Sequence, residues 1–165
     1  DERAYFKIKS LFRNKVAMPF FDISMGTSCS LNCKLCSQWF PYLQKKELFN
    51  PDEIVDNLKI IFKYVDIVHN VAVIGGEPFL NPGITKVLVF LDEMHKQGKL
   101  TFIRVITNGT TMPSENVLSF FKLPHFELVI SHYPLEKIGN ECLTYMFTYG
   151  TYPKGLSSKN LNLPD

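Results

Sequence analysis

The fold is decided by the segment Val71-Ala-Val-Ile-Gly-Gly76, a short apolar run that ends in two glycines. An apolar run of this length next to turn residues is typical of a buried strand that leads into a loop. Upstream, Asn50 and Pro51 open a stretch whose apolar residues recur at helical spacing as far as Val65. Asn50 suits a helix cap and Pro51 the first helical position. A helix followed by a buried strand is therefore predicted.

The same alternation extends in both directions along the chain. A second helix is predicted from Asn81-Pro82 to a stop at Gly98, and a shorter one from Pro113 to Phe121. Strands that alternate with helices need crossover connections, so we expect them to be parallel. The predicted fold class is α/β, a partial (β/α) barrel, with strands at 20–24, 71–74, 102–106 and 126–130.

The length of 165 residues allows one domain with a substantial core. We expect a basic arm or helix over residues 1–18, a core over 19–133, and a C-terminal segment or tail over 134–165. Within this last segment, 145–152 could form one more strand or hairpin. The expected sheet is incomplete, which fits either a short, open barrel or a chain that lacks elements of a longer parent.

Bulk properties disfavour several classes of function. A net charge of +2 gives no general electrostatic ground for nucleic-acid binding. Neither a membrane-spanning apolar run nor an opening signal-peptide pattern is present, so no membrane partner and a cytoplasmic location are expected. Three of the four cysteines are clustered and Cys142 lies far from them, which is a poor disulfide framework. Cys142 is expected to be a buried free thiol.

The clustered cysteines, Cys29, Cys33 and Cys36, fall in the loop after the first predicted strand. Thiolates favour zinc or iron–sulfur iron over hard cations. A structural zinc site needs four ligands, so it would require a histidine such as His69 or His132. In an iron–sulfur cubane, three cysteines instead leave one iron open to a non-protein ligand, which is a catalytic arrangement.

Two motifs on successive strand-to-helix loops resemble those of the radical S-adenosylmethionine (SAM) superfamily. They are Cys29-x3-Cys33-x2-Cys36 and Gly75-Gly-Glu-Pro78. Their flanking residues, with Ile106-Thr-Asn-Gly109, are similar to members that carry an additional C-terminal cysteine-rich region. The resemblance covers Phe20 to His132 and implies a reduced or truncated radical SAM core. It also implies a [4Fe-4S] cluster on the three cysteines, with SAM chelating the remaining iron.

The resemblance further implies a set of SAM-binding residues. The glycine backbone accepts hydrogen bonds from the amino group of SAM, and the acidic residue after it adds negative charge nearby. The family often has an aromatic residue where this chain has Leu35, so Trp39 or Phe40 is expected to replace it against adenine. The set consists of Gln38 toward adenine, Gly75, Gly76, Glu77 and Pro78 toward the amino group, and Asn108 and Ser131 toward ribose or carboxylate.

The implied function is reductive cleavage of SAM at the cluster, which gives a 5′-deoxyadenosyl radical that abstracts hydrogen from a substrate. The substrate, a small molecule or a peptide, is unidentified, and no catalytic side chain is assigned. Electrons are expected from a donor such as a flavodoxin or ferredoxin. Two alternatives stay open: a glycyl-radical-type activase that acts on a partner protein, and a cluster- or SAM-binding protein without turnover.

Charged residues also occur inside otherwise apolar strands, namely Asp22, Arg104 and Glu127. An unpaired buried charge is costly, so each of them needs a partner. They either form a polar floor under the substrate on the concave side of the sheet, or pair with each other for structure alone. His132, just beyond the fourth strand, is either a substrate contact or proton donor, or an ordinary surface residue.

Overall fold

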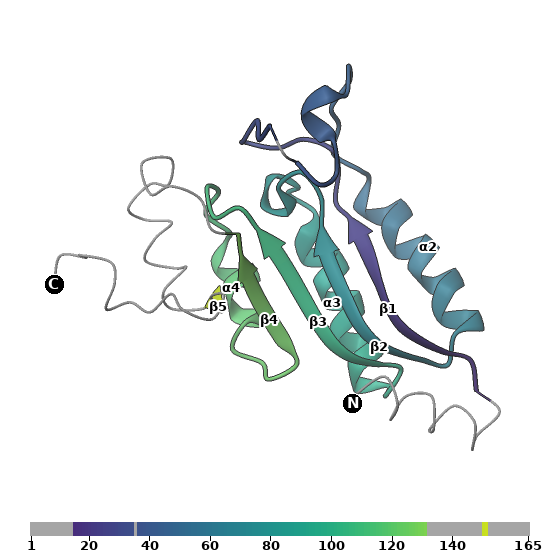
Figure 1. The fold of residues 1–165 in the computed structure, drawn as a ribbon. Helices are drawn as coiled ribbons and strands as arrows, with labels where there is room; N and C mark the ends of the chain where they lie inside the picture. Colours follow the sequence, from purple (N-terminus) through teal and green to yellow (C-terminus); the bar gives the residue numbers. More distant parts are fainter. Residues whose placement is uncertain (1–14, 35, 132–149, 152–165) are drawn as a thin grey trace, which may run out of the picture.

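The computed structural model describes residues 15–34, 36–131 and 150–151. These residues form a parallel sheet with strand order β1-β2-β3-β4-β5, and the helices α2, α3 and α4 lie on one face of it (Figure 1). The predicted α/β class with parallel strands is confirmed. The elements are β1 (Ala17–Ser24), η1 (Phe40–Tyr42), α2 (Pro51–Tyr64), β2 (Ile67–Ile74), η2 (Pro78–Leu80), α3 (Ile84–Lys96), β3 (Leu100–Thr107), α4 (Glu115–Phe120), β4 (Phe126–Ile130) and β5 (Gly150–Thr151).

The four predicted strands are present, and three of them are longer than expected. β2 begins at Ile67 because Val68 and the polar Asn70 pair with both neighbouring strands, although the polar side chains of His69 and Asn70 are not typical of a strand. β5 lies inside the segment expected to form one more strand and pairs in parallel with β4. The remainder of that segment lies outside the described residues.

The helices begin and end close to the predicted positions, with one correction. Asn50 caps α2 as predicted, since its Oδ1 accepts a hydrogen bond of 2.9 Å from the backbone N–H of Asp52. α3 begins at Ile84 rather than at Asn81, because a 3-10 turn, η2, precedes it. The side chain of Asn81 is committed to loop contacts, including a 3.0 Å hydrogen bond from the backbone N–H of Gly83.

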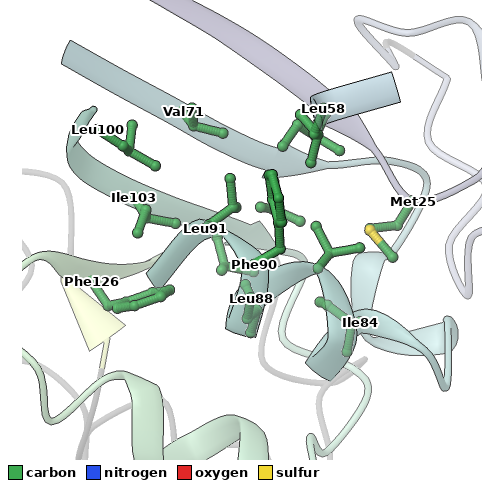
Figure 2. Packing of buried hydrophobic residues seen from close by; sticks show 14 of the residues in the cluster. Met25, Leu58, Val71, Ile84, Leu88, Phe90, Leu91, Leu100, Ile103 and Phe126 are labelled. Atoms are coloured by element: carbon green, nitrogen blue, oxygen red, sulfur yellow. The ribbon is translucent and has the colours of Figure 1, made fainter. Parts of the chain in front are cut away.

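The hydrophobic core lies between the helices and one face of the sheet, as Figure 2 shows for Leu88 and Leu91 of α3 near Val71 and Ile103 of the strands. All four side chains are fully shielded from solvent. Burial of each stabilises the fold by roughly 1.5–3 kcal/mol. Successive strand residues point to opposite faces, so their neighbours point to the other side of the sheet. No helix of the described part covers that second face (Figure 1).

Several expectations concern residues outside the described ranges. They include most of the basic arm, His132, Cys142 and nearly all of the C-terminal segment. β1 begins at Ala17, two residues before the boundary expected for the core. Among the described helices, none is both long enough and apolar enough to cross a bilayer.

Candidate functional site

A pocket of about 460 Å³ lies where the loops leave the carboxyl ends of the strands. Parallel α/β folds place their ligands at this edge, and the volume is within the range of small-molecule sites. Glu77 and Pro78 do not line this pocket, whereas most residues predicted for the site do. Those that line it are Cys29, Cys33, Cys36, Gln38, Gly75, Gly76, Asn108 and Ser131.

The cysteine loop packs directly on the glycine edge of β2. Backbone pairing continues past the strand ends, with hydrogen bonds of 3.0 Å from Gly76 N to Gly26 O and 2.9 Å from Glu77 N to Ser28 O. A Cβ atom on Gly76 would lie 2.1 Å from the carbonyl oxygen of Ser28 and 2.9 Å from the Cβ of Cys29. Glycine is therefore required at position 76 because the loop that carries the first cysteine occupies the place of a side chain.

The same loop is closed at its base by contacts between its two ends. Thr27 N donates to Glu47 O at 2.8 Å, and Glu47 N donates to the hydroxyl of Thr27 at 3.0 Å. The buried Asn81 then joins the two sides, since its Nδ2 donates to the carbonyls of Met25 and Phe49, both at 2.8 Å. No local pattern indicates this brace, since Asn81-Pro82 predicts only the start of a helix.

Two N–H groups point at the sulfur of Cys29. The backbone N–H of Leu31 and the side-chain Nδ2 of Asn108 both lie 3.4 Å from it. Burial raises the pKa of the Cys29 thiol above its ordinary value, while these two hydrogen bonds act in the opposite direction. Donors aimed at sulfur favour the thiolate form that a metal ligand requires.

Asn108 joins the loop after β3 to the cysteine loop. Its Nδ2 also donates to Ser30 Oγ at 3.0 Å, and its Oδ1 accepts from the backbone N–H and the hydroxyl of Thr110, at 2.9 and 2.7 Å. The hydroxyls of Ser30 and Thr110 are also in contact. The side chain of Asn108 thus lines the pocket and holds the first cysteine in place.

Glu77 lies beneath the pocket and is only 1% exposed. Its Oε1 accepts hydrogen bonds from Thr107 Oγ1 at 2.8 Å and Phe79 N at 3.1 Å, and its Oε2 accepts from Asn108 N at 2.8 Å. Burial raises the pKa of Glu77, and the three hydrogen bonds oppose that rise. The structure therefore directs this carboxylate toward the end of β3. Thr107, its partner there, also lines the pocket and was not predicted.

Three thiols that line one pocket are a donor set that an iron–sulfur cubane with one open iron can use. Among the described residues, no three His, Cys, Asp or Glu side chains converge on one ion position, although the three cysteines line one pocket. His69 lies five residues before Ile74, about 16 Å along the strand at 3.3 Å per residue, and on the same side of the sheet as Val71 and Val73, which the helices bury. A cubane places each thiolate on a different iron, so its cysteines surround a volume rather than a point.

Both interpretations of the charged strand residues hold in part. Arg104 Nε lies 2.6 Å from Glu127 Oε2, so these two residues form an ion pair. Asp22 instead lines the pocket, as expected of a polar floor. Phe40 also lines the pocket, whereas Trp39 is 69% exposed and does not; Leu35 lies outside the described residues. Unpredicted apolar lining residues such as Ile74 and Ile106 gave no signal, because they look like any strand residue.

Comparison with known proteins identifies similar sequences and structures. GTP 3′,8-cyclase of Aquifex aeolicus is 30% identical over 90 residues, which is 53% of this chain and 27% of that protein. Streptococcus suis SuiB, in a structure bound to S-adenosylmethionine, is similar with a TM-score of 0.56 at 18% identity. The likeness covers 81% of this chain and 29% of SuiB. The structure of anSMEcpe with bound AdoMet also has a TM-score of 0.56 at 18% identity, over 81% and 41% of the two chains.

The likeness of this chain to SuiB and anSMEcpe confirms the predicted partial (β/α) barrel. The chain spans less than half the length of each of these relatives. A family model described as the Radical SAM superfamily matches residues 23–145, most of the chain and both cysteine and glycine motifs. This match, together with a pocket lined by the same motifs, shows that the chain belongs to the Radical SAM superfamily.

Proposed function

We propose that this chain is the cofactor-binding core of a radical SAM enzyme. Cys29, Cys33 and Cys36 hold a [4Fe-4S] cluster, and SAM binds beside it along the edge formed by Gly75 and Gly76. The observation that carries the proposal is the convergence of the cysteine loop and this glycine edge on one pocket. A cluster held by these cysteines would supply the electron for reductive cleavage of SAM to methionine and a 5′-deoxyadenosyl radical, the species that would abstract hydrogen from the substrate.

The residues of the chain position these groups and shield them. The backbone of Gly75 and Gly76 lies along the pocket without side chains in front of it, which leaves room for an amino group to approach. Glu77 supports this edge through its hydrogen bonds with Thr107 and Asn108, and Pro78 follows it as the first residue of η2. Gln38, Asn108 and Ser131 offer polar groups around the pocket. Ile74 and Ile106 add apolar surface that limits the access of water to a reactive intermediate.

The substrate belongs to one of two chemical classes. SuiB has been solved with its precursor peptide SuiA, and anSMEcpe with a peptide, which supports a peptide substrate. The similar GTP 3′,8-cyclase is named for a nucleotide, which supports a small molecule. A reducing donor such as a flavodoxin or ferredoxin, and a cytoplasmic location, complete the proposal.

The test is to reconstitute the chain anaerobically with iron and sulfide, reduce it with dithionite, add SAM, and quantify methionine and 5′-deoxyadenosine. We expect both products from the unsubstituted chain and from the control variant Cys142→Ser, whose cysteine lies outside the motif. Cys33→Ala should give neither. Products formed by Cys33→Ala at the rate of the unsubstituted chain would contradict the proposal. If the unsubstituted chain binds SAM but forms neither product, the result supports the alternative of a SAM-binding protein without turnover.

A further inference from the structure

A row of four residues crosses the sheet, and Asp22 at one end of the row lines the pocket. The strand register pairs Asp22 with Ala72, Ala72 with Arg104, and Arg104 with Glu127. Residues in register on neighbouring parallel strands point to the same side of a sheet. The residues next to them in sequence, such as Val73 and Val105, are buried under the helices. The row therefore lies on the face that no described helix covers (Figure 1).

The positive charge in this row is already compensated. Arg104 Nε lies 2.6 Å from Glu127 Oε2, and its guanidinium lies 5.6 Å from the ring centroid of Phe102 on the same strand. Neighbouring strands lie about 4.8 Å apart, so the Cα atoms of Arg104 and Asp22 are about 10 Å apart. Between them in the row lies Ala72, whose side chain is a methyl group. The arginine is thus turned toward Glu127, away from Asp22.

Asp22 has no such compensation. No hydrogen bond or ion pair to its carboxylate exists among residues 15–34 and 36–131. Among the described residues that line the pocket, it is also the one that carries a formal charge at neutral pH. Ile74 and Ile106 line the same pocket nearer the ends of their strands. The side chain of Asp22 is exposed, so water solvates the carboxylate, and a cation that enters the pocket can meet it without breaking an existing ion pair among the described residues.

Asp22 also lies away from the glycine edge proposed for the amino group of SAM. Ser24 is in register with Ile74, the residue before Gly75. Asp22 is therefore three residues below the level of Gly75, about 10 Å along the strand direction at 3.3 Å per residue. The carboxylate faces the part of the pocket that a second molecule would enter from the uncovered face of the sheet.

We infer that Asp22 binds an alkylammonium group of the substrate, such as a lysine side chain or a free primary amine. This inference rests on the proposed function, because it treats the pocket as one that also holds SAM. Asp22 accepts charge-assisted hydrogen bonds from the ammonium, and Ile74, which also lines the pocket two residues beyond Ala72, offers apolar surface to the alkyl chain. The Arg104–Glu127 ion pair occupies the other end of the row. Because its two charges cancel, it repels neither the ammonium group nor the alkyl chain of such a ligand strongly.

The experiment uses ligands that differ only in charge, added to the reconstituted chain with SAM. One arm uses a tripeptide with a central lysine, norleucine or glutamate; the other uses n-butylammonium, n-butanol or butyrate. Binding is measured by ligand-observed NMR and by fluorescence of Trp39, the single tryptophan, which lies between the pocket-lining residues Gln38 and Phe40. The two arms distinguish a peptide from a small amine as the source of the ammonium.

We expect the ammonium ligand of at least one arm to bind at least about tenfold more tightly than its neutral counterpart, and Asp22→Asn to abolish that preference. Asp56→Asn, a matched change at an exposed residue of α2, should keep it. Equal binding of charged and neutral ligands, binding of neither, or an unchanged preference in Asp22→Asn would overturn the inference. It would also fail if Asp22→Asn weakened SAM binding but not amine binding.

The inference and the proposed function can fail separately. Iron content and SAM cleavage by the unsubstituted chain test the proposed function without any added amine. An ammonium preference in a chain that does not cleave SAM would contradict the proposed function alone. Cleavage of SAM without an ammonium preference would contradict the role of Asp22 alone.

Discussion

Replacement of Gly76 by alanine tests how the glycine edge and the cysteine loop depend on each other. The new Cβ would lie 2.1 Å from the carbonyl oxygen of Ser28, so the loop must move by about 1 Å to regain normal contact. Such overpacking costs about 1–3 kcal/mol, and loss of the hydrogen bond from Glu77 N to Ser28 O adds about 1 kcal/mol. We therefore expect Gly76→Ala to lower the free energy of unfolding by about 2–4 kcal/mol.

The larger consequence should be for the cluster, because Ser28 immediately precedes Cys29. Chemical denaturation measures the stability of the variant, and iron per chain after anaerobic reconstitution measures its cluster. Gly98→Ala is the matched control: its φ of 70° makes alanine unfavourable by about 1–2 kcal/mol, but nothing lies within 4 Å of the new Cβ. We expect Gly76→Ala to lose most of its iron and Gly98→Ala to keep it. Equal iron content in the two variants would refute the idea that Gly76 positions the cysteine loop.

Two further predictions concern residues around Asp92 and Asn108. Asp92 contacts Lys96 Nζ at 2.6 Å and His125 Nε2 at 2.8 Å. Burial alone would raise the pKa of Asp92, but these hydrogen bonds and charges outweigh it and hold the pKa below its ordinary value. The stabilisation is therefore present above the unfolded-state pKa of about 3.9 and is lost as the pH falls through the lower folded-state value. Urea denaturation from pH 6 to 2.5 should show Asp92→Asn less stable by about 1–3 kcal/mol at pH 6, with the difference shrinking in acid; a constant difference would contradict this. Asn108→Ala removes one N–H donor from Cys29 Sγ, so an EPR-monitored redox titration should give the bound cluster a more negative reduction potential, and an unchanged potential would count against that hydrogen bond.

The fold was largely predictable because its signals are local. The apolar run at 71–74 and the glycines after it indicated a buried strand, and Asn50 marked the start of α2 at the observed cap. The alternation of these elements then required parallel strands. The local pattern missed polar strand residues such as Asn70, which pairing with β1 and β3 holds in the sheet. It also missed the short turn η2, which the neighbouring Glu77 caps.

The site was predictable only to the level of its motifs. The spacing of the three cysteines and the pair of glycines are recognisable sequence patterns, and the structure brings these residues to one pocket. The supporting contacts were not predictable, because they join residues far apart in the sequence. Asn81 braces the loop through Met25, 56 residues away, and Glu77 reaches Asn108 across 31 residues. No spacing rule indicates such pairs before the chain is folded.

The measurement that tests the central proposal most directly is EPR spectroscopy of the reconstituted, reduced chain with and without SAM. If Cys29, Cys33 and Cys36 hold a cubane with one open iron, the chain should contain about four irons, and its spectrum should change when SAM is added. One bound zinc per chain, or a cluster spectrum that SAM leaves unchanged, would contradict an open-iron site in this pocket.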